Sequence, residues 1–358
     1  MDPIAAFSPD YFTARQRFRD AADRQGWAVE SHPIAATGPN GEPLTIDVAA
    51  TPEMSHEKTL ILSSGVHGVE GPFGSAVQLG LIERWGRTPP IRCVMIHAVN
   101  PFGFAHRRRF NEENVDQNRN FLLPGQDYGG SPDGYAELDS ILNPRRPPPR
   151  VDPFPLRAVW NVMRHGLPKL KQAIAAGQYD HPKGIFFGGS GPSESHRILA
   201  AHFPRWLGQS RRVVHFDYHT GLGARGAVKL LLDTELTNHR RRQLTDWFGA
   251  DTFEVCHHDG LAYDARGGFG LWCEAVAGDR DYLFACTEFG TYGPISMLGG
   301  LKRENQAYHW CKPNAPSTER AKRELAELFC PAAAEWRERV VNRSWSLVDA
   351  AVTGLSAT

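Results

Sequence analysis

The stretch TLILSSGVHGVEGPFGS, residues 59–75, shows the pattern of the whole fold in one short segment. Its apolar start, TLIL, is typical of a buried β-strand. Glycines follow, and they allow the backbone to turn tightly. From residue 73 onward, apolar side chains recur at helical spacing. A strand, a tight turn and a helix in this order are the repeating unit of an α/β sheet.

The rest of the chain repeats this alternation of strands and helices. Strands are predicted at residues 44–50, 59–65, 91–99, 213–221, 228–233 and 281–290. Helices are predicted at residues 9–25, 73–86, 156–176, 192–207, 235–249 and 317–340. We therefore expect an α/β fold, a three-layer sandwich in which helices flank a mixed, mainly parallel twisted sheet.

One segment interrupts the pattern. Residues 122–155 are too rich in Pro and Gly for regular structure and could form a domain linker or a surface excursion. We favour the excursion, because the strand–helix pattern resumes after it without a change in composition. The chain, residues 1–358, is therefore expected to form a single domain.

The composition limits the kinds of partner. Lys+Arg and Asp+Glu balance at 40 each, so no overall charge favours binding to nucleic acid or anionic membranes. The N-terminal residues lack the apolar core of an export signal, and no apolar run is long enough to span a membrane. The six cysteines contain no C-x-x-C pair, so we expect free thiols in a cytoplasmic protein. One disulfide among Cys256, Cys273 and Cys286 stays open, and the oligomeric state is not indicated.

His67 and Glu70 are candidate metal ligands because of their position. An H-x-x-E pair is expected about once by chance among this many histidines. However, these two follow a predicted strand, and open α/β sheets bind ligands outside the carboxyl ends of their strands. His219, in FDYHTGLG, ends another predicted strand and could complete the three N/O ligands of a catalytic zinc, with Asp217 orienting its imidazole. The alternative for His67 and Glu70 is that they happen to fall together in a loop. The alternative for His219 is a strand-end histidine bonded to a backbone carbonyl.

Two further segments could carry chemistry. Glu288 ends an apolar strand, where a carboxylate suits either a general base beside a metal or a salt bridge. The loop 100–121 is rich in Arg and Asn, which suit recognition of a carboxylate or an oxyanion; the alternative is a solvated basic loop. Nucleic-acid binding is less expected there, because Glu112, Glu113 and Asp116 interrupt the basic run.

The order of these motifs resembles that of a known superfamily. The chain carries, in sequence, H-x-x-E, N-P-x-G-F, D-x-N-R-N-F, D-x-H-T-G and E-F-G-T. This order resembles the M14-type zinc carboxypeptidase superfamily. Within it the chain, including GIFFGGSGPSESHRIL at 184–199, is most similar to the DUF2817 branch, which is related to the succinylglutamate desuccinylase/aspartoacylase group.

The resemblance implies a catalytic centre in a zinc carboxypeptidase-like domain. His67, Glu70 and His219 would hold one Zn²⁺ per chain. Glu288 would be the catalytic glutamate, the general base that acts on zinc-activated water. Arg109 would stabilise the oxyanion, with Arg108 as the alternative.

The resemblance also implies how a substrate would bind. Asn118 and Arg119 match the family's pair that grips a substrate carboxylate. Tyr263, in GLAYDARGGFG, is the candidate for the tyrosine that the family carries on a mobile loop. The implied partner is a small molecule or peptide with a free carboxylate.

The expected function is therefore zinc-dependent hydrolysis of an amide bond, in a peptide or an N-acyl amino acid. A deacylase rather than a peptidase, and a non-catalytic binding module on the same fold, are the alternatives. A serine hydrolase would use Ser63, Ser64 or the GGSG at 188–191, but no G-x-S-x-G motif is present. Metal binding by CHHD, residues 256–259, is disfavoured because adjacent side chains of an extended segment point to opposite faces.

Overall fold

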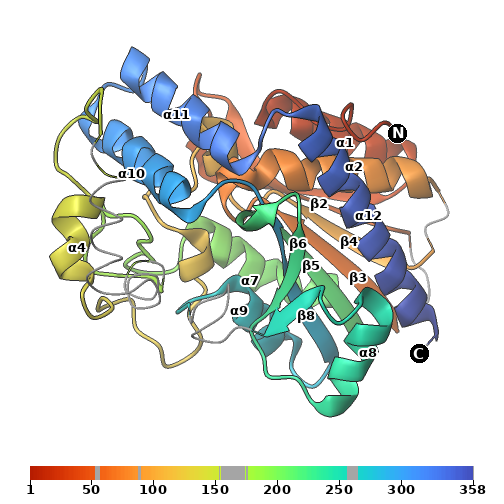
Figure 1. Cartoon of the computed structure of the whole chain (residues 1–358). Helices are drawn as coiled ribbons and strands as arrows, with labels where there is room; N and C mark the ends of the chain where they lie inside the picture. The colour runs from red at the N-terminus through yellow and green to blue at the C-terminus, as the bar shows by residue number, and fades with distance from the viewer. Residues whose placement is uncertain are drawn as a thin grey trace.

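A twisted sheet of eight strands forms the centre of the computed structural model, in the order β1-β2-β4-β3-β5-β8-β6-β7 (Figure 1). The structure describes residues 1–52, 57–87, 90–152, 154, 174, 176–255 and 265–357. The strands are β1 (Ala28–Thr37), β2 (Pro43–Ala50), β3 (Lys58–Ser64), β4 (Arg92–His97), β5 (Arg212–Arg225), β6 (Val228–Leu232), β7 (Phe253–Val255) and β8 (Asp281–Gly290). Neighbours within β4-β3-β5-β8 run parallel, whereas β1, β2 and β6 join antiparallel to their inner neighbours. The predicted mixed, mainly parallel sheet is confirmed.

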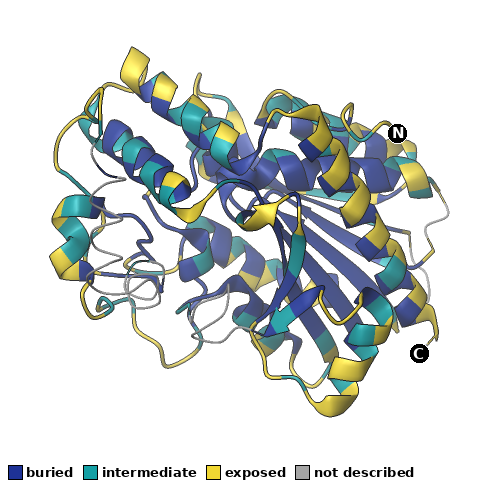
Figure 2. Ribbon diagram, viewed as in Figure 1, coloured by how far each residue is buried: buried dark blue, intermediate teal, exposed yellow. Residues whose placement is uncertain are grey.

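Helices cover both faces of the sheet. They are α1 (Tyr11–Arg24), α2 (Gly71–Trp85), α3 (Pro101–His106), α4 (Tyr135–Leu142), α7 (Glu194–Leu207), α8 (Asn238–Phe248), α9 (Phe269–Ala277), α10 (Pro294–Trp310), α11 (Pro316–Phe329) and α12 (Ala334–Ala357). Alternate residues of β3 show the layers: Leu60 and Leu62 pack with α1, α2, α8 and α12, whereas Ile61 packs with α7 and α9. The inner strands are buried and the outer faces of the helices exposed (Figure 2). The three-layer sandwich is thus confirmed.

Two sequence-based expectations need correction, and a third lies mainly outside the described residues. The helix predicted at 317–340 is two helices, α11 and α12, because Pro331 lacks the N–H that a continuous helix needs. The Pro/Gly-rich segment 122–155 contains regular structure after all, the helix α4. The helix predicted at 156–176 falls mainly outside the described residues. Among the described helices, none combines the length and apolar character needed to cross a membrane.

The glycines after β3 serve two different purposes. Gly65 has a φ of +65°, so it makes the turn that glycine favours. Gly68 lies in the short 3₁₀ helix η1 (Gly68–Glu70) and instead allows α3 to pack closely against it. A Cβ at this position would lie 2.1 Å from the carbonyl carbon of Gly103. Gly71 likewise faces the ring of Phe104. Packing against α3, rather than turn geometry alone, therefore explains the glycines around Glu70.

The substitution Gly68→Ala tests this packing. The added methyl must displace either α3 or η1, and overpacking of this kind costs about 1–3 kcal/mol. We expect urea denaturation to show that loss in the free energy of unfolding. Gly129→Ala is the control, because a Cβ there meets nothing within 4 Å. Equal stability of the two variants would contradict the close approach of α3.

Candidate metal centre

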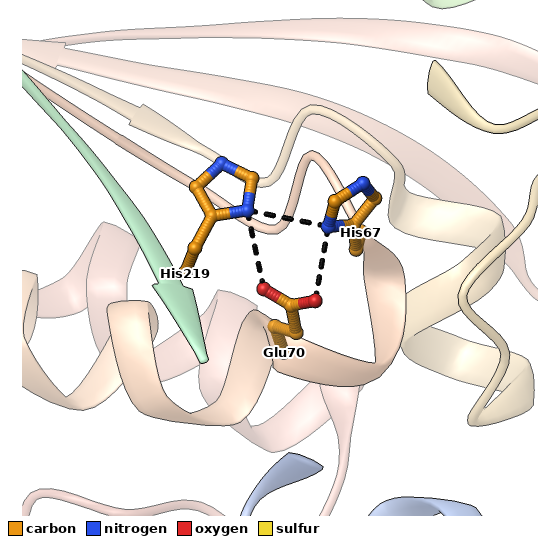
Figure 3. Close-up of side chains that lie close together, drawn as sticks. All are labelled: His67, Glu70 and His219. Atoms are coloured by element: carbon orange, nitrogen blue, oxygen red, sulfur yellow. Dashed lines mark hydrogen bonds and ion pairs between the residues drawn. The ribbon is translucent and has the colours of Figure 1, made fainter. Parts of the chain in front are cut away.

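His67, Glu70 and His219 converge at the carboxyl ends of β3 and β5 (Figure 3). Their ligand atoms all lie within 4.8 Å of one another. Glu70 Oε1 lies 2.9 Å from His67 Nδ1, and Glu70 Oε2 lies 3.3 Å from His219 Nδ1. The two Nδ1 atoms are 3.2 Å apart. All three residues are at least 96% buried. The fold thus brings together, in its interior, residues that are distant in sequence.

Two aspartates determine which ring nitrogens face the centre. His67 Nε2 lies 3.1 Å from Asp116 Oδ1, and His219 Nε2 lies 2.5 Å from Asp217 Oδ2. An ionised carboxylate can only accept hydrogen bonds, so each Nε2 carries its hydrogen and donates it. Both Nδ1 atoms are then left as acceptors aimed at the same point. The sequence predicted this role for Asp217 but not for Asp116, the first residue of D-x-N-R-N-F.

The converging acceptors fit a metal ion. Two imidazole nitrogens and one carboxylate oxygen would repel one another unless a proton or a cation lay between them. Burial opposes ionisation of Glu70, but His67 and His219 outweigh it and hold the pKa of Glu70 below its usual range. Burial would lower the pKa of His219, but Asp217 and Glu70 raise it well above its usual value. A cation bound between the three groups would relieve this repulsion, and the two nitrogens and one carboxylate oxygen are of the type that zinc uses.

Glu288 lies beside this cluster. It is the direct partner of His219 in the β5–β8 register, and its Oε1 accepts a hydrogen bond from the Leu222 N–H at 2.7 Å. Burial, together with the negative charge of Glu70, raises the pKa of Glu288 to about 7. A carboxylate of this kind can take up and release a proton near neutral pH. Sequence reasoning missed Cys286, which forms a second close group with His219 and Glu288.

The structure separates the two arginine candidates. Arg109 reaches the cluster: its Nε donates to Asp116 Oδ2 at 2.9 Å, and its Nη1 lies 3.4 Å from Glu70 Oε1. Arg108 points elsewhere. It is fully buried, donates to Glu304 at 2.8 Å and lies with its guanidinium carbon 3.3 Å from the ring centroid of Tyr308. Arg109 therefore lies at the cluster because Asp116 and Glu70 hold its guanidinium there, whereas Glu304 and Tyr308 hold that of Arg108 away from it.

Asn118 and Arg119 lie in the 3₁₀ turn η2 (Gln117–Arg119), directly after Asp116. The Asn118 Oδ1 accepts a hydrogen bond from the Phe269 N–H at 2.8 Å, at the start of α9. The Arg119 side chain is buried, and its Nη1 donates to the Asn118 carbonyl oxygen at 2.5 Å. These contacts fix the pair near the cluster without showing a substrate role. Tyr263 and the CHHD segment lie outside the described residues.

A comparison with protein-family models places the chain in a family. The family described as "Protein of unknown function (DUF2817)" matches residues 7–343, and the chain belongs to it. The family expected from the ordered motifs is thereby confirmed. No curated protein gives a match.

Several solved structures share the general arrangement at low identity. The murein-tripeptide amidase MpaA from Escherichia coli O157 is 20% identical, with a TM-score of 0.41, over 78% of this chain and 95% of that one. Carboxypeptidase A from Helicoverpa armigera is 11% identical, with a TM-score of 0.46, over 91% of this chain and 74% of that one. Bovine thrombin-activatable fibrinolysis inhibitor is 11% identical, with a TM-score of 0.46, over 96% and 97% of the two chains.

The donor set predicts zinc uptake that depends on His67. We expect elemental analysis to find about one zinc per chain after loading and dialysis, and zinc to raise the melting temperature. His67→Ala removes one ligand and should lower the retained zinc well below that value, because two ligands hold the ion weakly. His239→Ala, an exposed position on α8, is the control and should retain zinc as the unsubstituted protein does. Zinc retention by both variants would contradict the site.

Proposed function

We propose that the protein is a zinc-dependent hydrolase that cleaves an amide bond in a peptide or an N-acyl amino acid. The observation that carries this proposal is the convergence of two imidazoles and a carboxylate beside a fourth buried group, Glu288. The order of motifs shared with zinc carboxypeptidases supports it. Peptides and N-acyl amino acids present the same amide bond, so both belong to the proposed substrate class.

His67, Glu70 and His219 would hold the zinc ion. When bound, zinc supplies Lewis acidity that polarises a carbonyl group and makes water more acidic. The protein's part is to aim the three ligand atoms before metal arrives. Asp116 and Asp217 do this by fixing the outer nitrogens of the two imidazoles.

Glu288 would act as the general base. Its carboxylate would accept a proton from the attacking water and later deliver it to the amine that leaves. The backbone N–H of Leu222 holds one of its oxygens in place. Burial raises the pKa of this carboxyl above its usual value, which favours uptake of the proton that the base must later release.

Arg109 would stabilise the negative charge that develops on the carbonyl oxygen. Its guanidinium is buried beside Glu70 and Asp116, and a charge held in such surroundings acts strongly on a nearby oxyanion. Asn118 and Arg119 would bind the substrate's free carboxylate, and Tyr263 would contribute from its loop. These assignments rest on the motif order and on the position of the pair beside Asp116.

The serine-hydrolase alternative has less support. Ser63 and Ser64 are both fully buried, and their hydroxyls bond to neighbouring side chains in the sheet and in α2. Both hydroxyls are thus committed to these partners, and the sequence contains no G-x-S-x-G motif.

The substitution Glu288→Gln tests the general base. The amide keeps the size of the side chain but cannot accept the proton, so we expect kcat to fall by about 10²–10⁴-fold while zinc stays bound. The measurement is steady-state hydrolysis of short peptides and N-acyl amino acids, with zinc content measured alongside. Glu274→Gln, a half-buried position on α9, serves as the control. Full activity in zinc-loaded Glu288→Gln would rule out this base.

The substitution Arg119→Ala tests carboxylate recognition. Loss of a charge-assisted contact should raise KM by about 10–100-fold and leave kcat less affected. The matched comparison is a substrate whose carboxylate is blocked as an amide. The unsubstituted enzyme should bind this substrate poorly, whereas Arg119→Ala should not distinguish it from the free acid. An unchanged preference for the free carboxylate in the variant would place recognition elsewhere.

A further inference from the structure

Behind Asp217 lies another layer of polar side chains. The Ser63 hydroxyl on β3 donates to Asp217 Oδ1 at 2.6 Å. The same oxygen of Ser63 lies 2.7 Å from His215 Nε2 on β5, and His215 Nδ1 lies 2.7 Å from the Tyr282 hydroxyl on β8. Ser63 and His215 are fully buried and Asp217 is 1% exposed. A continuous hydrogen-bonded chain thus runs across three strands from Tyr282 to the imidazole of His219.

The direction of every hydrogen bond in this chain can be assigned by elimination. Ser63 has one hydrogen, and it is used in the bond to Asp217. The short contact between Ser63 and His215 therefore needs a hydrogen on His215 Nε2. Burial lowers the pKa of His215 to about 4, so this ring is neutral and its Nδ1 has no hydrogen. That nitrogen must accept from the Tyr282 hydroxyl.

The opposite tautomer of His215 would break the chain. With its hydrogen on Nδ1, the ring would accept the Ser63 hydrogen at Nε2, and Asp217 Oδ1 would lose its partner. The Tyr282 hydroxyl, which also has Cys273 as a side-chain hydrogen-bond partner, favours the first state when it donates to Nδ1. Asp217 then has one oxygen held by Ser63 and the other directed at His219.

We propose that Tyr282, His215 and Ser63 are positioning residues: they hold Asp217 so that His219 presents Nδ1 to the metal, and they thereby set the affinity of the centre. The inference rests on the proposed function, because it requires a metal at this cluster. Partners that orient metal ligands typically change metal affinity by about 10–100-fold when they are lost. The competing explanation is that the same bonds only stabilise the fold.

Ser64 provides a matched control for Ser63. The two serines are neighbours on β3, both are fully buried, and both donate a side-chain hydrogen bond. The Ser64 hydroxyl, however, is 3.0 Å from Gln78 Oε1 in α2, on the other face of the sheet. Alanine at either position removes a buried hydroxyl, but only alanine at position 63 removes a partner of Asp217.

The first experiment compares zinc affinity by chelator competition, with the melting temperature of the metal-free protein measured in parallel. Ser63→Ala and Ser64→Ala should lower the melting temperature similarly. Ser63→Ala should weaken zinc binding by about tenfold or more, whereas Ser64→Ala should leave it within about twofold of the unsubstituted protein. Unchanged zinc affinity in Ser63→Ala would overturn the positioning role.

The second experiment uses Tyr282→Phe and does not depend on how Ser63→Ala folds. Phenylalanine keeps the ring of Tyr282 and removes only the hydroxyl that lies 2.7 Å from His215 Nδ1. In the metal-free protein, ¹⁵N NMR should show His215 with its hydrogen on Nε2, and Tyr282→Phe should increase the Nδ1–H form and weaken zinc binding. An Nδ1–H tautomer in the unsubstituted protein would overturn the proposal, as would an unchanged tautomer and affinity in Tyr282→Phe.

The outcomes separate this inference from the proposed function. If the unsubstituted protein binds zinc and hydrolyses amides, and Ser63→Ala and Tyr282→Phe have the same zinc affinity as it does, only the positioning role is rejected. An unsubstituted protein that binds no zinc would reject both.

Discussion

The donation of two imidazole N–H groups to two buried aspartates is the interaction on which the site depends. Asp116 and Asp217 fix the outer nitrogens of His67 and His219, and this leaves the inner nitrogens as acceptors that face Glu70. Without these carboxylates each ring could turn or exchange tautomers at little cost. With them, a carboxylate and two acceptor nitrogens face one another in a buried site. Only a cation or a proton placed between these groups can remove their mutual repulsion.

The sheet supplies the positions that these contacts need. His67 follows β3, whereas His219 lies within the neighbouring parallel strand β5 and Glu288 within β8, paired in register with His219. Because carboxyl ends of parallel strands meet at one edge, side chains from three distant parts of the sequence arrive together. The buried contact of α3 with Gly68 then keeps η1, and so Glu70, against this edge.

Much of this arrangement could be predicted from sequence because its signals are local. Apolar runs of strand length gave the central strands, and polar residues at their ends gave the candidate ligands. The edge strand β1 carries Pro33 and several exposed residues, so it lacks that signal. The break between α11 and α12 depends on one proline within an otherwise helical pattern.

Contacts between segments were harder to predict. The choice of Arg109 over Arg108 depends on Glu304 and Tyr308 of α10, which capture the other guanidinium. The role of Asp116 toward His67 likewise depends on how the loop after α3 folds back on β3. Residue type and spacing do not predict such contacts, because packing between segments that are far apart in the sequence determines them.

The cluster lies at three adjacent strands, β3, β5 and β8, and is thus structurally distinct from the connecting segments. His219 and Glu288 lie in the hydrogen-bonded interior of the sheet, and His67 and Glu70 are packed directly against it, so one change there disturbs several neighbours. The segments that surround them, such as the one containing α4, are connections that can change in length and composition at smaller cost. Changes in such connections would therefore alter what surrounds the cluster of His67, Glu70, His219 and Glu288 without moving the cluster itself.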